Sequence, residues 1–286
     1  MADASEMFAG LVDTLRKLNA GEVEPVEPRH AATVIMLRDG SDGPEVYLLR
    51  RAASMAFAAG AFVFPGGSVD LRDEDLPDEA WVGRPPAEWA TDLSSDERLA
   101  RALVCAAVRE TFEESGVLLA GPDGTTVVAD TSGDDWEADR LALIDRSLSL
   151  AELMRRRGLV VRADLLRPWT HWLTPEVESR RFDTRFFVAI LPEGQRTRDV
   201  GGEADRVAWM RPQAALEGNE RGEMMLMPPT LASLRDLSEF SSVAATQAAA
   251  AERTVTRILP KLIFDENDNL KFLLPHEPGY PQEAAG

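Results

Sequence analysis

Three glutamates with helical spacing are the residues of this chain best placed to do chemistry. Glu110 lies three residues before Glu113 and four before Glu114, so a helix would carry all three carboxylates on one face. The opposite side of that helix would be apolar, with Val104, Val108 and Phe112. Two bare carboxylates at this spacing repel each other by roughly 1 kcal/mol in water. A divalent cation would turn this repulsion into a binding site, and a solvated acidic face is the alternative interpretation of these three residues alone.

The residues around the glutamates favour a site. Arg109 directly precedes them, and Gly116 can end the helix in the left-handed conformation. The run 109–117 resembles the second half of the Nudix box, R-E-U-x-E-E-x-G-U with U an aliphatic residue, and Thr111 is the one imperfect match. Pro65-Gly66-Gly67 is similar to the opening of the same box. Here an insertion separates the two halves.

This resemblance implies a fold and a reaction. The fold is α/β, the Nudix-type α/β/α sandwich with a mixed sheet, here with extra helices at the C-terminal end. The family hydrolyses the diphosphate linkage of nucleoside diphosphate-linked compounds and uses Mg²⁺ or Mn²⁺. We therefore expect a diphosphatase in which carboxylate oxygens hold the cation and activated water attacks phosphorus.

The resemblance also assigns roles to individual residues. Glu110 and Glu114 are expected to be direct metal ligands, with Glu113 a third ligand or the general base; Glu110 and Glu113 are therefore also counted as catalytic. Arg109 is expected to orient a neighbouring glutamate through a charge-assisted hydrogen bond. The family's glutamate eight residues before the arginine would fall at Arg101, so that residue is not carried over.

Other candidate site residues lie outside the helix. Gly66 and Gly67 are expected to let the backbone pass close under the helix on the substrate side. Glu203, in a Gly-Gly-Glu loop before a strand ending near Trp209, is either a functional acid or an ordinary loop charge. Arg51 is either a surface cation or a contact for a substrate phosphate.

Composition narrows the class of partner. The 286 residues contain 49 Asp and Glu against 31 Lys and Arg, a net charge of −18, which opposes broad binding to nucleic-acid backbone. An anionic substrate must therefore meet local arginines and a metal. The single Cys105 and the widely separated His30, His171 and His276 disfavour a Cys/His zinc site and leave an oxygen-liganded cation.

Targeting and membrane signals are not evident. The N-terminus lacks a basic region followed by an apolar core, and no apolar run approaches the roughly 18 residues of a membrane span. We expect a cytoplasmic protein whose partner is a small-molecule diphosphate, with neither nucleic acid nor membrane as partner. A homodimer is compatible with the sequence.

The chain divides into three predicted parts: an N-terminal helix and connector (1–28), a Nudix hydrolase domain (29–240) and a C-terminal helix and tail (241–286). Within the domain, residues 31–37 and 46–49 predict a hairpin. The motif helix is predicted to begin at Ser94, which has capping-box spacing to Glu97, and to run to Ser115.

The insertion 68–93 is rich in proline and acidic residues and carries Trp81 and Trp89. Two tryptophans in a loop suggest that something apolar is covered. We interpret the segment as a substrate-side lid or an oligomer contact rather than core, so that its replacement by a Gly/Ser linker would leave a folded protein.

The split box, the run 60–67 and the strand 181–187 look most like the coenzyme A and acyl-coenzyme A diphosphatase branch of the family. Arg51 fits the first arginine of that branch's extra motif, whereas the second would fall at Ala56. The apolar residues 55–58 could suit an acyl chain or a pantetheine arm, or could be ordinary core. The expected products are adenosine 3′,5′-bisphosphate and a 4′-phosphopantetheine.

Three alternatives stay open at this point. One is a diphosphatase acting on ADP-ribose, a nucleotide sugar or a dinucleoside polyphosphate. Another is a catalytically silent Nudix-like binding module. The last is an unrelated helical protein with an accidental match, which would show no response to metal.

Overall fold

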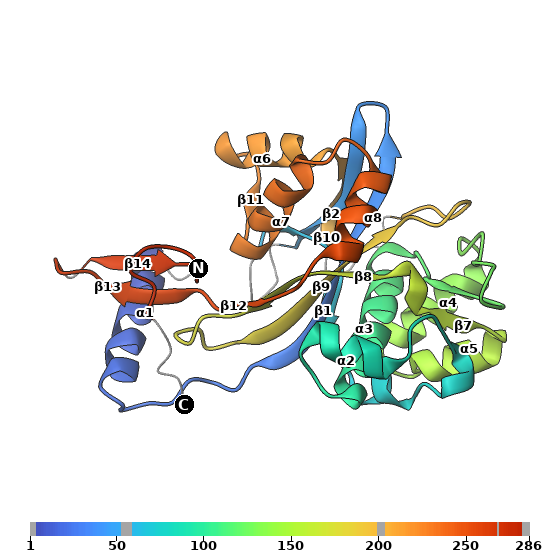
Figure 1. Cartoon of the computed structure of the whole chain (residues 1–286), viewed down its shortest axis with the longest axis horizontal. Helices are drawn as coiled ribbons and strands as arrows, with labels where there is room; N and C mark the ends of the chain where they lie inside the picture. The colour runs from blue at the N-terminus through green and yellow to red at the C-terminus, as the bar shows by residue number, and fades with distance from the viewer. Residues whose placement is uncertain (1–3, 53–58, 199–203, 268, 282–286) are drawn as a thin grey trace. The chain divides into compact units, whose positions relative to one another are not determined.

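The computed structural model describes residues 4–52, 59–198, 204–267 and 269–281. The chain forms two compact units. One comprises residues 31–170 and 185–255, and the other comprises residues 1–30, 171–184 and 256–286. The three glutamates lie in the first of these units, which is described in most detail below (Figure 1).

A mixed sheet forms the centre of the fold. Its strand order is β11-β3-β2-β1-β9-β8-β12, with β10 paired to β2 and β4 paired to β1. β11 and β12 run parallel to their neighbours β3 and β8, and the pairs β1–β2 and β2–β3 are antiparallel. The strands are β1 (Arg29–Gly40), β2 (Gly43–Arg51), β3 (Ala61–Val63), β4 (Gly66–Ser68), β8 (Arg167–Leu173), β9 (Phe182–Ile190), β10 (Ala204–Met210), β11 (Met225–Leu226) and β12 (Arg257–Ile258). The predicted hairpin is confirmed, with Leu37 opposite Val46.

Both faces of this sheet are covered by helices. In β1, Val34 and Met36 join the same buried cluster as the motif helix, whereas the alternating Ile35 and Leu37 are buried outside that cluster. Helices α6 (Pro212–Glu220), α7 (Pro228–Ser238) and α8 (Val243–Glu252) lie across the sheet from α3 (Glu97–Ser115), as Figure 1 shows. A strand that is buried on both faces has a nearly continuous apolar sequence, and β1 has this pattern. The predicted α/β/α sandwich with additional C-terminal helices is confirmed.

Helix α3 begins and ends at capping residues. Asp96 is the N-cap, and its side chain accepts a hydrogen bond of 2.8 Å from the amide of Leu99. Gly116 ends the helix at φ 74°, as predicted. The predicted start at Ser94 is wrong, because Ser94 is the left-handed C-cap of the preceding helix α2 (Pro86–Leu93). Pro85 and Pro86 fix the start of that helix, and α3 cannot begin until α2 has ended.

The insertion is part of the core. It folds into the 3₁₀-helices η1 (Leu71–Asp75) and η2 (Asp78–Ala80), the strand β5 (Trp81–Val82) and α2. Leu76, Trp89 and Leu93 are at most 3% exposed and belong to the buried cluster of α3. The interpretation of this segment as a lid is therefore wrong. The apolar surface that its tryptophan covers is the side of α3 itself, with Phe187 against the Trp89 ring edge.

A second layer of short elements surrounds α3. The strands β6 (Ala120–Gly121) and β7 (Val160–Arg162) form a small sheet with β5, next to η3 (Ala163–Leu165). The helices α4 (Asp134–Ile144) and α5 (Leu150–Arg157) complete this layer. In α4, Trp136 packs edge-on against Phe112 of α3, so the apolar side of the motif helix is enclosed.

The other unit contains both ends of the described chain. It holds α1 (Ala4–Asn19), β12 and an antiparallel hairpin of β13 (Lys261–Phe264) and β14 (Leu270–Leu273). The guanidinium of Arg16 lies 5.4 Å above the ring of Phe264, which joins α1 to the hairpin. Throughout the described residues, no helix has the length and apolar character that crossing a bilayer requires.

Candidate active site

The glutamate face of α3 lies against β4. Glu114 Oε2 accepts a hydrogen bond of 2.8 Å from the amide of Gly66. A Cβ atom added at Gly67 would lie only 2.5 Å from Glu110 Oε1, and one added at Gly66 would lie 2.5 Å from the carbonyl oxygen of Ala32. At Gly66 the close contacts are with the backbone of β1, so only glycine fits there, whereas a methyl group at Gly67 would displace the Glu110 carboxylate.

Arg109 lies at the centre of a carboxylate cluster that comprises Glu110, Glu113 and Asp73. Its side chain is only 10% exposed, and Nη1 donates to Glu110 at 2.7 Å and to Glu113 at 3.1 Å. Nη2 donates to the carbonyl oxygen of Ser68 at 2.9 Å. The guanidinium therefore holds two of the three glutamates and the end of β4 in one arrangement, which is the orienting contact that the sequence predicts.

Asp73 completes the cluster and was missed from the sequence. Both of its oxygens accept hydrogen bonds from Arg109, from Nε and from Nη2, each at 2.9 Å, and the residue is 2% exposed. Counting eight residues back from Arg109 leads instead to Arg101, which binds the carbonyl oxygen of Leu76 and the carboxylate of Asp78. Asp73 lies in η1 at the start of the insertion, six residues after Gly67, so counting forward from Gly67 would have reached it.

Burial raises the pKa of these carboxyl groups. It raises the pKa of Glu110 to about 7, with the neighbouring Glu113 acting in the same direction and Arg109 acting against it. Burial likewise raises the pKa of Glu113 and of Asp73, again against the effect of Arg109. One guanidinium thus faces several buried carboxyl groups, and negative charge is left without compensation.

The donor set fits a hard divalent cation. Carboxylate oxygens are the ligands that Mg²⁺ and Mn²⁺ prefer, and excess buried negative charge is what a cation would neutralise. In the part of the chain that the structure describes, no three acidic, histidine or cysteine side chains already converge on one point. Arg109 binds Oε1 of both Glu110 and Glu113, so a cation would be met by the second oxygen of each carboxylate.

Two predicted site residues lie outside the motif helix. Arg51 is the last residue of β2 and lies opposite Ala204 of β10. Glu203, Ala56 and the rest of the segment 55–58 lie outside the described residues. Their roles therefore remain predictions.

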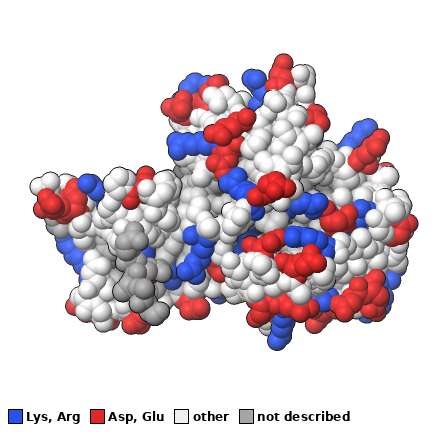
Figure 2. All heavy atoms as spheres, in the orientation of Figure 1, with Lys and Arg blue, Asp and Glu red and all other residues white. Residues whose placement is uncertain are grey.

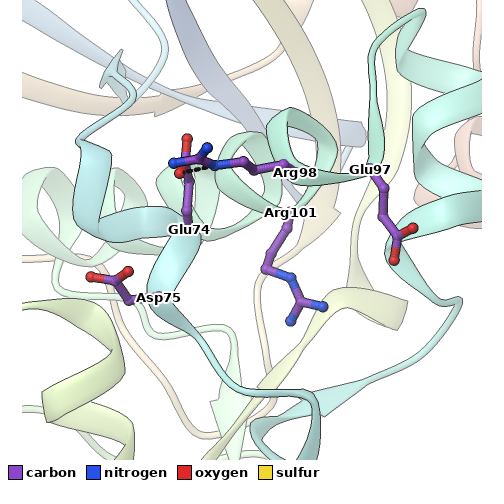
Figure 3. Close-up of a pocket in the computed structure, with 5 residues that line it drawn as sticks. All are labelled: Glu74, Asp75, Glu97, Arg98 and Arg101. Atoms are coloured by element: carbon purple, nitrogen blue, oxygen red, sulfur yellow. Dashed lines mark hydrogen bonds and ion pairs between the residues drawn. The ribbon is translucent and has the colours of Figure 1, made fainter.

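A polar hollow at the other end of α3 is separate from the glutamates. Glu74, Asp75, Glu97, Arg98 and Arg101 line it, and Figure 3 shows Arg98 paired with Glu74 across it. Glu110 lies nine residues after Arg101, about 14 Å along the helix axis. Since both arginines already bind acidic partners, the hollow offers no uncompensated positive charge to a phosphate.

Charges on the molecular surface are interspersed. On the face shown in Figure 2, acidic groups are spread widely, and basic groups lie between them instead of forming one extended basic patch. An anionic ligand approaching this face would therefore depend on individual arginines and on a cation.

Comparison with known proteins decides the family. The model of the NUDT19 Nudix domain matches residues 84–237, which include α2, the whole of α3 and the strands β8 to β10. The chain belongs to this Nudix family. The three glutamates described above therefore lie on the Nudix motif helix, and the helix α2 of the insertion falls within the matched range.

Relatives extend this match over most of the chain. The acyl-coenzyme A diphosphatase NUDT19 of Xenopus laevis is 28% identical over 84% of this chain and 72% of its own length. The protein of the same name from Gallus gallus is also 28% identical, over 84% of this chain and 73% of its own. A crystal structure of a NUDIX hydrolase from Alicyclobacillus acidocaldarius is 29% identical and superimposes with a TM-score of 0.67, covering 78% of this chain and 96% of that one.

Gly67 offers a direct check on the close approach of β4 to α3. Gly67→Ala is expected to reduce kcat roughly 100-fold, because the new methyl group displaces the Glu110 carboxylate by an amount that active-site geometry does not tolerate. Steady-state kinetics with Mg²⁺ measures this. Gly124→Ala, in the exposed turn after β6, is the matched control and should change kcat less than about twofold. Equal rates for Gly67→Ala and wild type would show that Glu110 needs no fixed position.

Proposed function

We propose that this Nudix diphosphatase hydrolyses the diphosphate linkage of coenzyme A or acyl-coenzyme A. The observation that supports this substrate assignment is the similarity, over 84% of the chain, to proteins named acyl-coenzyme A diphosphatase. The products would be adenosine 3′,5′-bisphosphate and a 4′-phosphopantetheine. The acyl group of a thioester would stay on the pantetheine product.

Glu110, Glu113 and Glu114 would hold Mg²⁺ or Mn²⁺ in this proposal. The cation supplies charge neutralisation of the diphosphate and a more acidic water. In the reaction, the oxygen of a water molecule adds to one phosphorus as the bridging P–O bond breaks, and the bridging oxygen leaves with the other phosphate. One carboxylate of the trio takes the proton from the water, and Glu113 is the proposed base.

Residues behind the trio would fix its geometry. Arg109 holds Glu110 and Glu113, and Asp73 holds Arg109 through two parallel hydrogen bonds. The amide of Gly66 holds Glu114. Such outer contacts set the orientation of metal ligands, and their loss commonly costs about 10–100-fold in metal affinity or activity.

Arg51 and Glu203 complete the proposal at the substrate side. Arg51 would contact a phosphate of the nucleotide from the end of β2, and Glu203 would act as an additional acid near the cation. Both assignments rest on their positions in the Nudix pattern.

Substrate preference tests the proposal. We expect kcat/KM with Mg²⁺ to be at least about tenfold higher for coenzyme A and a medium-chain acyl-coenzyme A than for ADP-ribose. A factor of this size is what one charged hydrogen bond to the 3′-phosphate of coenzyme A would provide. The 3′-dephospho form of coenzyme A serves as the comparison that isolates recognition of the 3′-phosphate. A preference for ADP-ribose, a nucleotide sugar or a dinucleoside polyphosphate over every coenzyme A compound would contradict the substrate assignment.

A further inference from the structure

The last turn of the motif helix depends on hydrogen-bond donors from outside the helix. An α-helix leaves the carbonyl oxygens of its last residues without partners in the helix itself, and the last turn of α3 contains Glu113 and Glu114. The Gly116 amide binds the carbonyl oxygen of Phe112 at 2.9 Å. The next carbonyl along the chain is that of Glu113, a proposed metal ligand and the proposed base.

Arg140 of α4 donates to this carbonyl. Its Nη1 lies 2.7 Å from the carbonyl oxygen of Glu113, and its side chain is 3% exposed. Its Nε and Nη2 donate to the two carboxylate oxygens of Glu137, at 2.9 and 2.6 Å. A planar guanidinium bound on both sides in this way has a fixed orientation, so it ties the main chain of Glu113 to α4.

A second contact joins α4 to the same turn. The Trp136 ring packs edge-on against the ring of Phe112, with the ring centroids 6.1 Å apart. Phe112 and Glu113 are consecutive residues, so α4 holds the apolar side of the turn through Trp136 and a backbone carbonyl of the turn through Arg140.

Arg140 differs from the other donors at this end of α3. Thr131 Oγ1 donates to the carbonyl oxygen of Gly116 at 2.6 Å, and the Arg198 amide donates to that of Ser115 at 2.9 Å. Both of these acceptors follow the glutamates in the chain, whereas Arg140 binds a glutamate itself. It is also a cation at the negative end of the helix dipole, where positive charge is stabilising.

We propose that Arg140 is a positioning residue of the diphosphatase, which fixes the last turn of α3 so that the Glu113 and Glu114 carboxylates are held ready for the cation. The direction of a side chain follows from its backbone, and a small displacement of catalytic groups is costly to the rate. The inference rests on the proposed function and deepens it, because Arg140 acts through the main chain of Glu113 and needs no contact with substrate or metal.

Binding of Mn²⁺, followed through the electron paramagnetic resonance signal of the free ion, tests this without substrate. Arg140→Gln is expected to weaken Mn²⁺ affinity by about tenfold, the low end of the effect of contacts behind metal ligands, since the shorter side chain cannot span Glu137 and the Glu113 carbonyl. Arg140→Lys keeps the charge and a donor on a long side chain, so its loss of affinity should be smaller.

Arg157→Gln is the matched control. Arg157 pairs with Asp135 and Asp139 of α4, each at 2.6 Å, and its guanidinium lies 4.0 Å above the Trp136 ring. The substitution therefore removes an arginine and its ion pairs from the same helix while the donor to Glu113 remains. Both variants should lose stability in urea, but Arg157→Gln should keep its Mn²⁺ affinity within about twofold of the wild type.

Kinetics adds a second measurement. For coenzyme A at saturating Mg²⁺, Arg140→Gln should lower kcat by about tenfold and change KM far less, because Arg140 acts on the groups that react and not on substrate binding.

The outcomes separate this inference from the proposed function. Wild-type Mn²⁺ affinity in Arg140→Gln, or an equal loss of affinity in Arg157→Gln, would overturn the inference even if the wild type hydrolyses coenzyme A. No Mn²⁺ binding to the wild type would overturn it as well. If the wild type hydrolyses no coenzyme A compound while Arg140→Gln alone loses Mn²⁺ affinity, the proposed substrate fails and the role of Arg140 stands.

Discussion

Glu114→Gln is expected to reduce kcat for coenzyme A hydrolysis by about 100-fold or more, because it removes one negative oxygen from the proposed cation site. The substitution keeps the size of the side chain and an oxygen that can still accept the hydrogen bond from the Gly66 amide. The fold should therefore persist while Mg²⁺ binding weakens. Steady-state rates over a range of Mg²⁺ concentrations measure both effects, since weaker binding moves the half-saturating concentration upward.

Glu97→Gln is the matched control for this change. Glu97 lies in the first turn of the same helix, is exposed and lines the hollow of Figure 3. It removes the same charge from α3 at a distance from the glutamate trio, so rate and Mg²⁺ dependence should stay within about twofold of the wild type. An undiminished rate for Glu114→Gln would show that the metal assignment is wrong.

Asp73→Asn is expected to cost about 3 kcal/mol in the free energy of unfolding, because it leaves the buried Arg109 without its main counter-charge. The expected cost lies at the low end for a broken buried pair, since Arg109 keeps its contacts with Glu110 and Glu113. Urea denaturation followed by circular dichroism measures it. Turnover should fall as well, because Arg109 would no longer be fixed behind the two glutamates.

Asp75→Asn supplies the comparison for that experiment. Asp75 is the last residue of the same 3₁₀-helix η1 and is exposed, so its charge contributes little to folding and its loss should cost less than about 0.5 kcal/mol. Equal stability of the two variants would mean that the Asp73–Arg109 pair does not hold the insertion against α3.

The motif helix and its glycines could be predicted because their signals are local. The spacing of Glu110, Glu113 and Glu114 defines one face of a helix from the sequence alone, and Gly116 marks its end. The close approach of Gly67 to Glu110 follows from the same pattern. The start of the helix could not be placed correctly, since Ser94 and Asp96 are both competent capping residues and only the fold of α2 decides between them.

The contacts of the insertion could not be predicted, because their partners are distant in the sequence. Trp89 correctly indicated a covered apolar surface, but nothing in its neighbourhood specified that this surface is α3. The pairing of Asp73 with Arg109 spans 36 residues and depends on how α2 folds between them.

Product analysis of coenzyme A incubated with the protein and Mg²⁺ tests the central claim most directly. Chromatography with mass detection should find adenosine 3′,5′-bisphosphate and 4′-phosphopantetheine in equal amounts, and neither product should form in excess chelator or with Glu114→Gln. Release of inorganic phosphate with an intact diphosphate, or the same two products at the same rate without a divalent cation, would contradict a metal-dependent diphosphatase built on the carboxylates of α3.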